Sequence, residues 1–141
     1  MSILSSTNRG ILGIQESIEE WLKKKNISGY TIKQTLNSYP YFTIDVINAN
    51  VILVDYKDSE LPDYIIFNDI IGGNFIVSYS EISSMRGFPR KVGKNFDISY
   101  SKISILENVP ELIDRDFVAC GLHFTREDIE RKTIVTQYVY C

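Results

Sequence analysis

His123 is the residue with the most obvious capacity for chemistry, because it is the only histidine in the chain. A histidine-based triad needs a nucleophile and an acid beside the imidazole. Serine and aspartate are plentiful, but no G-x-S-x-G nucleophile motif is present. Gly72-Gly73 is not followed by the Gly-Lys-Ser/Thr of a phosphate loop, so we interpret it as a turn. We therefore expect a partly exposed His123 near the last turn, and no enzymatic activity.

Metal ligands do not form a recognisable pattern either. Cys120 has no partner in a C-x-x-C pair, which argues against a zinc site. Asp97, Asp114 and Asp116 could approach one another across stacked loops, but a regular Asp/Asn/Gly spacing for calcium is missing. Cys120 and Cys141 are the only cysteines, and we expect both to be reduced. We expect no metal and no cofactor.

A short basic run is the remaining charged feature, formed by Arg86, Arg90, Lys91 and Lys94. Such a run is typical of a solvated loop face. It could also provide an electrostatic contact for an acidic partner, and the sequence leaves both interpretations open.

An internal repeat tells us what must position these residues. The segment Asn74-Phe75-Ile76-Val77-Ser78-Tyr79-Ser80-Glu81-Ile82-Ser83 returns 21 residues later as Asn95-Phe96-Asp97-Ile98-Ser99-Tyr100-Ser101-Lys102-Ile103-Ser104. A decayed third copy begins at Asp116-Phe117-Val118-Ala119-Cys120. A fixed period of this length predicts a solenoid, in which neighbouring units bury one another's apolar faces.

Each repeat reads as one short strand, a turn and a looping return that contains a proline. Phe75 and Val77 lie two positions apart and should face inward together. The spacing Phe-x-Val-x-x-Ser-x-Ile matches the leucine-rich-repeat core L-x-L-x-x-N-x-L. Ser80 and Ser101 then occupy the inward polar position, where they should bond loop backbone that would otherwise be buried unpaired.

The chain resembles the small leucine-rich-repeat-like proteins of tailed bacteriophages over roughly residues 14 to 125. Their unit runs approximately F-x-C-S-x-N-x-L-T-S-L-x-G-x-P-x-x-V-G-G. In that register this chain carries Phe75, Ser78, Ile82, Ser84, Gly87, Pro89, Val92 and Gly93. Three segments near the start are similar too: Trp21-Leu22, Tyr30-Thr31-Ile32 and Thr43-Ile44-Asp45-Val46. The resemblance implies a phage accessory protein in the host bacterial cytoplasm, which binds and inhibits or redirects a host defence protein.

The elements predict one β-rich α+β domain over residues 1–141. We expect residues 1–9 to be flexible, 10–28 to be an amphipathic capping helix, and 29–73 to be a β-rich entry with a degenerate repeat that starts at Val51. The repeats occupy 74–124 and a C-terminal cap occupies 125–141. In that cap, Thr125 to Asp128 has the form of a helix N-cap. Thr133 to Tyr140 reads as one terminal strand, which could close the sheet or pair with another chain.

Composition excludes several classes of partner. The net charge is −3, from 15 basic and 18 acidic residues, which argues against a nucleic-acid footprint. No apolar run approaches the roughly 20 residues needed to span a bilayer. The first residues lack the features of a secretory signal. We therefore expect a cytoplasmic protein that binds neither nucleic acid nor membrane.

The outward rows of the repeat strands are the candidate partner-binding surface. Rows on neighbouring strands lie about 4.8 Å apart and so become contiguous. The predicted surface consists of Ile76, Ser78, Tyr79, Asp97, Ser99, Tyr100, Val118 and Cys120. Tyrosine is favoured at such contacts, so we expect a protein–protein interaction module. Two alternatives stay open: a self-assembling structural or virion-associated protein, and a protein that sequesters a small ligand such as a nucleotide.

Overall fold

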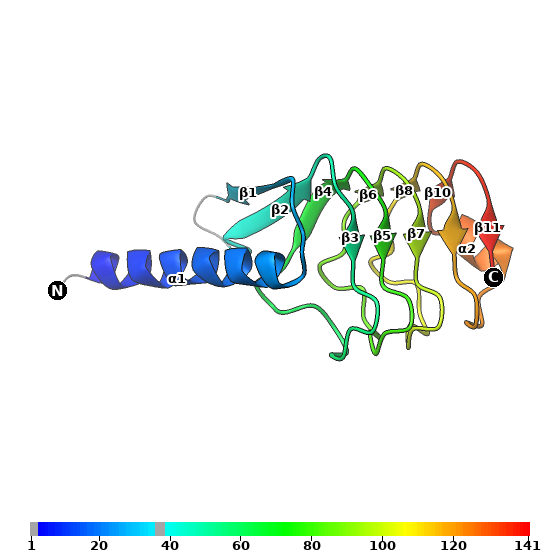
Figure 1. Cartoon of the computed structure of the whole chain (residues 1–141), viewed down its shortest axis with the longest axis horizontal. Coiled ribbons are helices and arrows are strands. Elements are labelled where there is room, and N and C mark those ends of the chain that lie inside the picture. Colours follow the sequence, from blue (N-terminus) through cyan, green and yellow to red (C-terminus); the bar gives the residue numbers. More distant parts are fainter. Residues whose placement is uncertain (1–2, 36–38) are drawn as a thin grey trace.

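The computed structural model describes residues 3–35 and 39–141. It is a β-solenoid of stacked parallel strands with an N-terminal helix, a small α+β fold (Figure 1). Each coil of the solenoid contributes one strand to each of two sheets. The β-rich, helix-capped class expected from the repeat is therefore confirmed.

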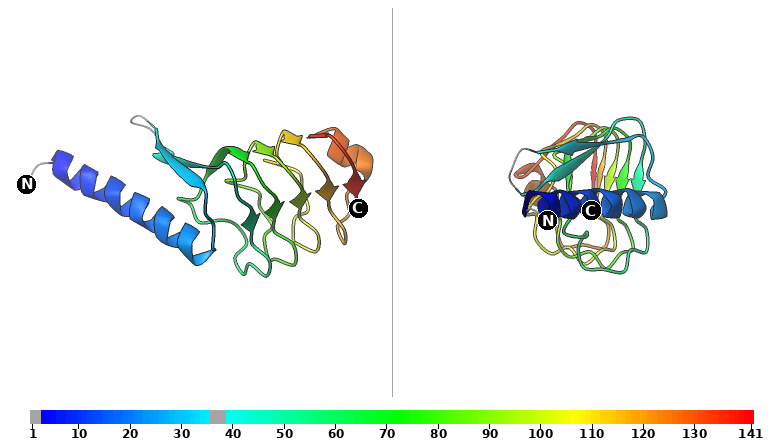
Figure 2. Two further views of the ribbon diagram at one scale, coloured as in Figure 1. Left: turned by 45° about the horizontal axis from the view of Figure 1, so that its top comes forward. Right: turned by 90° about the vertical axis from the view of Figure 1, so that its left-hand side faces the viewer.

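The helix α1 (Ile3–Lys24) precedes the solenoid. Its second half packs on the core, where Ile18, Trp21 and Leu22 are buried. Figure 2 shows α1 crossing the open end of the solenoid and projecting beyond it. The helix starts earlier than the expected residue 10, so the prediction that 1–9 are flexible was wrong for 3–9. No proline interrupts the chain there, and the packed half extends toward its N-terminus.

One sheet has six strands in the order β1-β2-β4-β6-β8-β10. The antiparallel pair at its edge is β1 (Tyr30–Gln34) and β2 (Phe42–Val46). The strands that follow are all parallel: β4 (Phe67–Ile71), β6 (Lys91–Val92), β8 (Leu112–Ile113) and β10 (Ile134–Val135). The looping return of each repeat therefore contains a second strand, where the sequence predicted only one. Val92 and Ile113 are fully buried, which explains why these returns are extended.

The other sheet carries the repeat strands in the order β11-β9-β7-β5-β3. They are β3 (Val51–Ile52), β5 (Phe75–Ile76), β7 (Phe96–Asp97), β9 (Phe117–Val118) and β11 (Val139–Tyr140). Val51 pairs with Phe75 and Phe96 with Phe117, so the degenerate first repeat and the fixed period are confirmed.

The predicted terminal strand from Thr133 to Tyr140 was wrong. This segment forms two strands, β10 and β11, which belong to different sheets and complete a further coil. Between β9 and β10 lies α2 (Arg126–Glu130), whose capping box joins Thr125 and Asp128 as expected.

A column of phenylalanines fills the solenoid. Phe75 stacks on Phe96 with ring centroids 5.9 Å apart, and Phe96 meets the edge of Phe117 at 5.0 Å. All three are fully buried. Burying such a ring stabilises a fold by about 1.5–3 kcal/mol, so this column is the main source of stability.

Polar ladders complete the coil corners. The backbone N–H of Asn95 donates to Asn74 Oδ1 at 2.9 Å, and that of Asp116 donates to Asn95 Oδ1 at 3.1 Å. Asn50 and Asp116 accept the N–H groups of Asn74 and Tyr138 in the same way. Each side chain therefore satisfies a backbone donor of the next coil.

The inward serines act within their own coil. Ser80 Oγ donates to the Val77 carbonyl at 2.6 Å and accepts from the Ile82 N–H at 3.4 Å. Ser101 Oγ accepts from the Ile103 N–H at 3.3 Å. The predicted inward, backbone-bonding role of both serines is confirmed, and the bonds between coils are made by the asparagines instead.

Candidate partner-binding surface

The predicted surface lies where β5, β7 and β9 end and the chain turns. Ile76, Asp97 and Val118 are half-buried on these strands, and Cys120 is half-buried beyond the last of them. Tyr79 and Tyr100 are the most exposed of the eight residues, at 61% and 52%.

Ser78 and Ser99 are buried, so the prediction that they point outward was wrong. The strands are only two residues long, and the alternation of faces stops where the corner begins. Ser99 Oγ instead accepts the backbone N–H of Cys120 at 2.9 Å. These serines support the corner from inside, while the tyrosines next to them face solvent.

Tyr79 and Tyr100 adopt the left-handed backbone conformation, with φ of 53° and 56°. This conformation costs an L-residue with a β-carbon roughly 1–2 kcal/mol. The same corner holds Asp55 in the preceding coil and Gly121 in the following one, with φ of 61° and 77°. Strain of this kind persists only where the surrounding structure over-determines it, and it is concentrated at functional sites.

The two tyrosine rings stack, with centroids 4.8 Å apart and planes inclined by 19°. Such a pair contributes about 0.5–1.5 kcal/mol beyond the area it buries. The stack also fixes both rings relative to the rigid coils beneath them. Tyr79 and Tyr100, called the tyrosine pair below, therefore form a preorganised aromatic surface.

Sequence reasoning identified both tyrosines but missed their backbone conformation. Tyrosine carries no signal for a positive φ. The glycine at the equivalent position of the third copy, Gly121, was the available signal, since glycine adopts this conformation without strain.

The basic run is largely neutralised. Arg86 pairs with Glu60 and Asp63, at 3.3 and 3.4 Å. Arg90 pairs with Asp69 and Glu111, at 3.7 and 3.2 Å. Only Lys91 and Lys94 of this run have no ion pair with a residue that the structure describes. These ion pairs favour the solvated-face interpretation of the run.

The other candidates for chemistry lie apart or bond backbone. Asp97 Oδ1 accepts from the Ser99 N–H at 2.8 Å, while Asp114 is exposed. Over residues 3–35 and 39–141 there is no group of three His, Cys, Asp or Glu side chains that could hold a metal ion. His123 is exposed, and Cys120 and Cys141 are free thiols.

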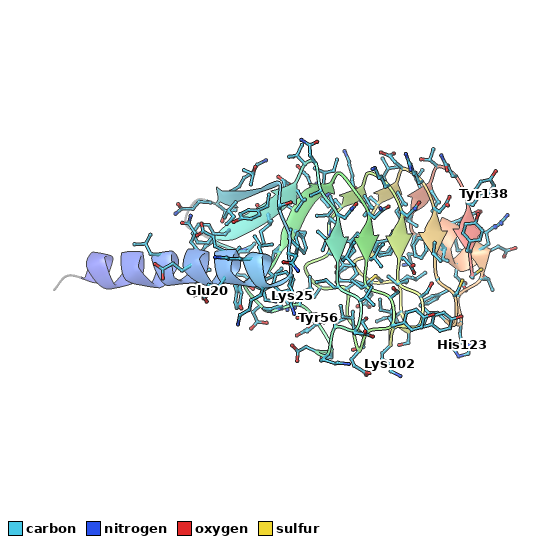
Figure 3. All side chains as sticks on the ribbon, in the orientation of Figure 1. Glu20, Lys25, Tyr56, Lys102, His123 and Tyr138 are labelled. Atoms are coloured by element: carbon cyan, nitrogen blue, oxygen red, sulfur yellow. The ribbon has the colours of Figure 1, made fainter. Side chains whose placement is uncertain are left out.

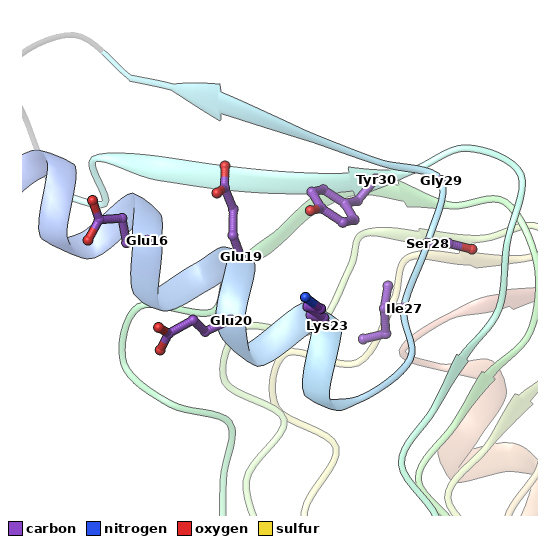
Figure 4. Close-up of a pocket in the computed structure, with 8 residues that line it drawn as sticks. All are labelled: Glu16, Glu19, Glu20, Lys23, Ile27, Ser28, Gly29 and Tyr30. Carbon is purple, nitrogen blue, oxygen red and sulfur yellow. The ribbon is translucent and has the colours of Figure 1, made fainter.

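A hollow of about 610 Å³ lies between α1 and β1 (Figure 4). Its charged lining residues are Glu16, Glu19, Glu20 and Lys23. Figure 4 shows Glu19 directed toward the strands, whereas Glu16 and Glu20 point to other sides of the helix. The carboxylates do not converge, so this hollow does not have the geometry of a polar site.

The junction between α1 and the first coil is an aromatic cluster. Trp21 meets Tyr56 edge-on with centroids 6.4 Å apart, and Lys25 Nζ lies 5.1 Å from the centre of the Tyr56 ring (Figure 3). Burial raises the pKa of the Tyr56 hydroxyl, and the nearby Asp58 carboxylate adds to that rise. This cluster attaches the helix to the solenoid and leaves the tyrosine pair uncovered.

Comparison with family models, curated proteins and solved structures found no match to this chain. In the described part of the chain, no helix is both long and apolar enough to cross a membrane.

Proposed function

We propose that this chain is a non-enzymatic protein–protein interaction module that binds through the tyrosine pair. The observation that carries the proposal is the combination of exposure and strain at Tyr79 and Tyr100. Aromatic residues held rigidly on a surface give up little conformational entropy on binding. Tyrosine is also among the residues that contribute most to interface energies.

The bacteriophage resemblance supports the biological setting of the proposal. In that setting the chain is an accessory protein in the host bacterial cytoplasm, and it inhibits or redirects a host defence protein. The partner is a protein, and binding needs no cofactor.

The test is an affinity pull-down from bacterial lysates, infected and uninfected, read by mass spectrometry. The variant Tyr79→Asn/Tyr100→Asn removes both rings with a residue that tolerates a positive φ. Tyr138→Asn is the matched control, because Tyr138 is 62% exposed but stands outside the pair. We expect one stoichiometric partner with the wild type and with the control, and its loss with the double variant. Equal capture by all three chains would refute the proposal.

A second candidate, self-assembly, is favoured by one observation. β10 and β11 are the outermost strands of the two sheets, and they expose Ile134 at 69% and Tyr140 at 48%. Unpaired edge strands promote association, and lysine at an edge opposes it. If self-assembly is the function, light scattering will show an oligomer for the wild type and a monomer for Ile134→Lys/Tyr140→Lys. A monomeric wild type would exclude this candidate.

A further inference from the structure

An open hollow of about 800 Å³ lies beside the tyrosine pair, between loop 101–107 and the segment 121–132 that includes α2. Its inner wall is apolar and includes Ile103, Leu122 and Phe124. Ile103 is buried, whereas the other two side chains are half-buried and so remain accessible from the hollow.

The rim of this hollow is positively charged. Lys102, Arg131 and Lys132 line it, and none of their side chains makes an ion pair or hydrogen bond with a residue that the structure describes. Figure 3 places Lys102 along the same lower edge of the solenoid as His123. By contrast, Arg86 and Arg90 are each paired with two carboxylates.

Acidic residues at the hollow do not balance this charge. The Asp128 carboxylate accepts the Thr125 N–H at 2.9 Å within the capping box, which leaves Glu107 as the one acid of the lining without such a bond in the described chain. Three free cations therefore face one free carboxylate in a chain whose net charge is −3. Charge complementarity calls for an anionic ligand here.

The hollow is also continuous with the tyrosine pair. Gly121 lines the hollow, and the ring of Tyr100 lies directly over it, because a β-carbon added to Gly121 would stand 2.4 Å from Tyr100 Cδ1. One extended segment could therefore contact the pair and enter the hollow. A small ligand would be left facing solvent in so open a site, whereas typical ligand pockets bury most of the ligand surface.

We propose that this hollow receives an acidic segment of the partner protein, with one apolar side chain against Leu122 and Phe124 and carboxylates at Lys102, Arg131 and Lys132. The inference rests on the proposed function and names the chemistry of the partner. It makes the basic rim the determinant of specificity and the tyrosine pair a neighbouring anchor.

The test is selection of short linear peptides from a random displayed library on the purified full chain. The best peptide is then labelled and its binding is measured by fluorescence anisotropy. We expect selected peptides to combine Asp or Glu with an aromatic or aliphatic residue. Lys102→Glu/Lys132→Glu should weaken binding about tenfold or more, because like charges then face each other. The control Lys91→Glu, an exposed charge reversal on β6 outside the hollow, should leave binding unchanged.

Several results would overturn the inference. They are a library that yields no binder, selected peptides that are neutral or basic, equal binding by the rim variant, and displacement of the peptide by inorganic phosphate alone. The lysate pull-down separates this inference from the proposed function. If only the tyrosine variant loses the partner, the tyrosine surface stands and the hollow does not. If only the rim variant loses it, the hollow stands and the tyrosine surface does not.

Discussion

The ring of Tyr100 occupies the space that a side chain on Gly121 would need. A β-carbon there would stand 2.4 Å from Cδ1 and 2.6 Å from Cε1 of the ring. Gly121 is therefore the seat on which the tyrosine pair rests, and its φ of 77° favours glycine for a second, independent reason.

Gly121→Ala should lower the free energy of unfolding by about 1–2 kcal/mol through backbone strain alone, and by more where the ring is displaced. The measurement is urea denaturation followed by circular dichroism. A double-mutant cycle with Tyr100→Ala separates the two contributions, because the added methyl group meets no ring in that background. We expect a coupling of about 0.5 kcal/mol or more between the two sites. Strict additivity would show that the ring does not rest on Gly121.

Asn95→Ala tests the polar ladder between coils. The change removes the acceptor of the Asp116 N–H and should cost about 1–2 kcal/mol, the typical penalty for an unpaired, partly buried donor. Asn95→Asp should cost far less, because Asp116 performs the same role toward the Tyr138 N–H with a carboxylate. Urea midpoints of the two variants check the prediction. Equal losses would mean that packing, and not the accepted hydrogen bond, holds this corner.

The ladder also shows where sequence reasoning succeeds and where it stops. The 21-residue period fixed the stacking of Phe75 on Phe96, because identical units in register must place identical side chains together. The asparagines recur at the same period, but their acceptor role depends on the backbone N–H groups of the next coil. Those donors are placed only by the stacking itself, so the role was not visible in the local sequence.

The last coil and the buried carboxylate of β2 were missed for related reasons. Val139 takes the position of Phe117 after 22 residues instead of 21, so the repeat no longer aligns and the segment reads as a single strand. In β2 the alternation predicted a half-buried strand, but all five residues are buried. Asp45 is covered there because β4 bulges against it and uses its carboxylate.

Asp45→Ala should be among the most destabilising polar substitutions in this protein. Asp45 Oδ1 accepts the N–H groups of Asp69 and Ile70 at 3.0 and 3.2 Å, and Oδ2 pairs with Lys33 at 3.1 Å. Removing the carboxylate leaves two donors of the bulge without a partner, at a cost of about 2–4 kcal/mol. Lys33→Ala is the matched comparison. It should cost about 1 kcal/mol or less, because the lysine side chain is exposed. Thermal and urea unfolding of both variants give the comparison.

Two glycine-to-alanine changes should act in opposite directions. A β-carbon on Gly72 would stand 1.9 Å from the Ile47 carbonyl oxygen, a backbone atom that cannot turn aside. Gly72→Ala should therefore destabilise the fold by about 3 kcal/mol. Gly13 lies in α1 with nothing within 4 Å of the added carbon, so Gly13→Ala should stabilise the helix by about 0.5–1 kcal/mol. Changes of the same sign in a melting experiment would contradict this account of the close corner.

Acid should release the capping box of α2. The pKa of Asp128 is lowered, first by the hydrogen bond from the Thr125 backbone N–H and then by that with the Thr125 side chain. A lowered pKa in the folded state means that the charged carboxylate stabilises the fold above its ordinary value of 3.8, and that this contribution disappears as the pH falls through the folded pKa. Urea midpoints of the wild type and Asp128→Asn should therefore differ near neutral pH and converge well below pH 3.8. Glu130→Gln, at the other end of the same helix, is the control for general charge effects. A difference between the wild type and Asp128→Asn that persists unchanged in acid would show that the carboxylate charge contributes nothing to the cap.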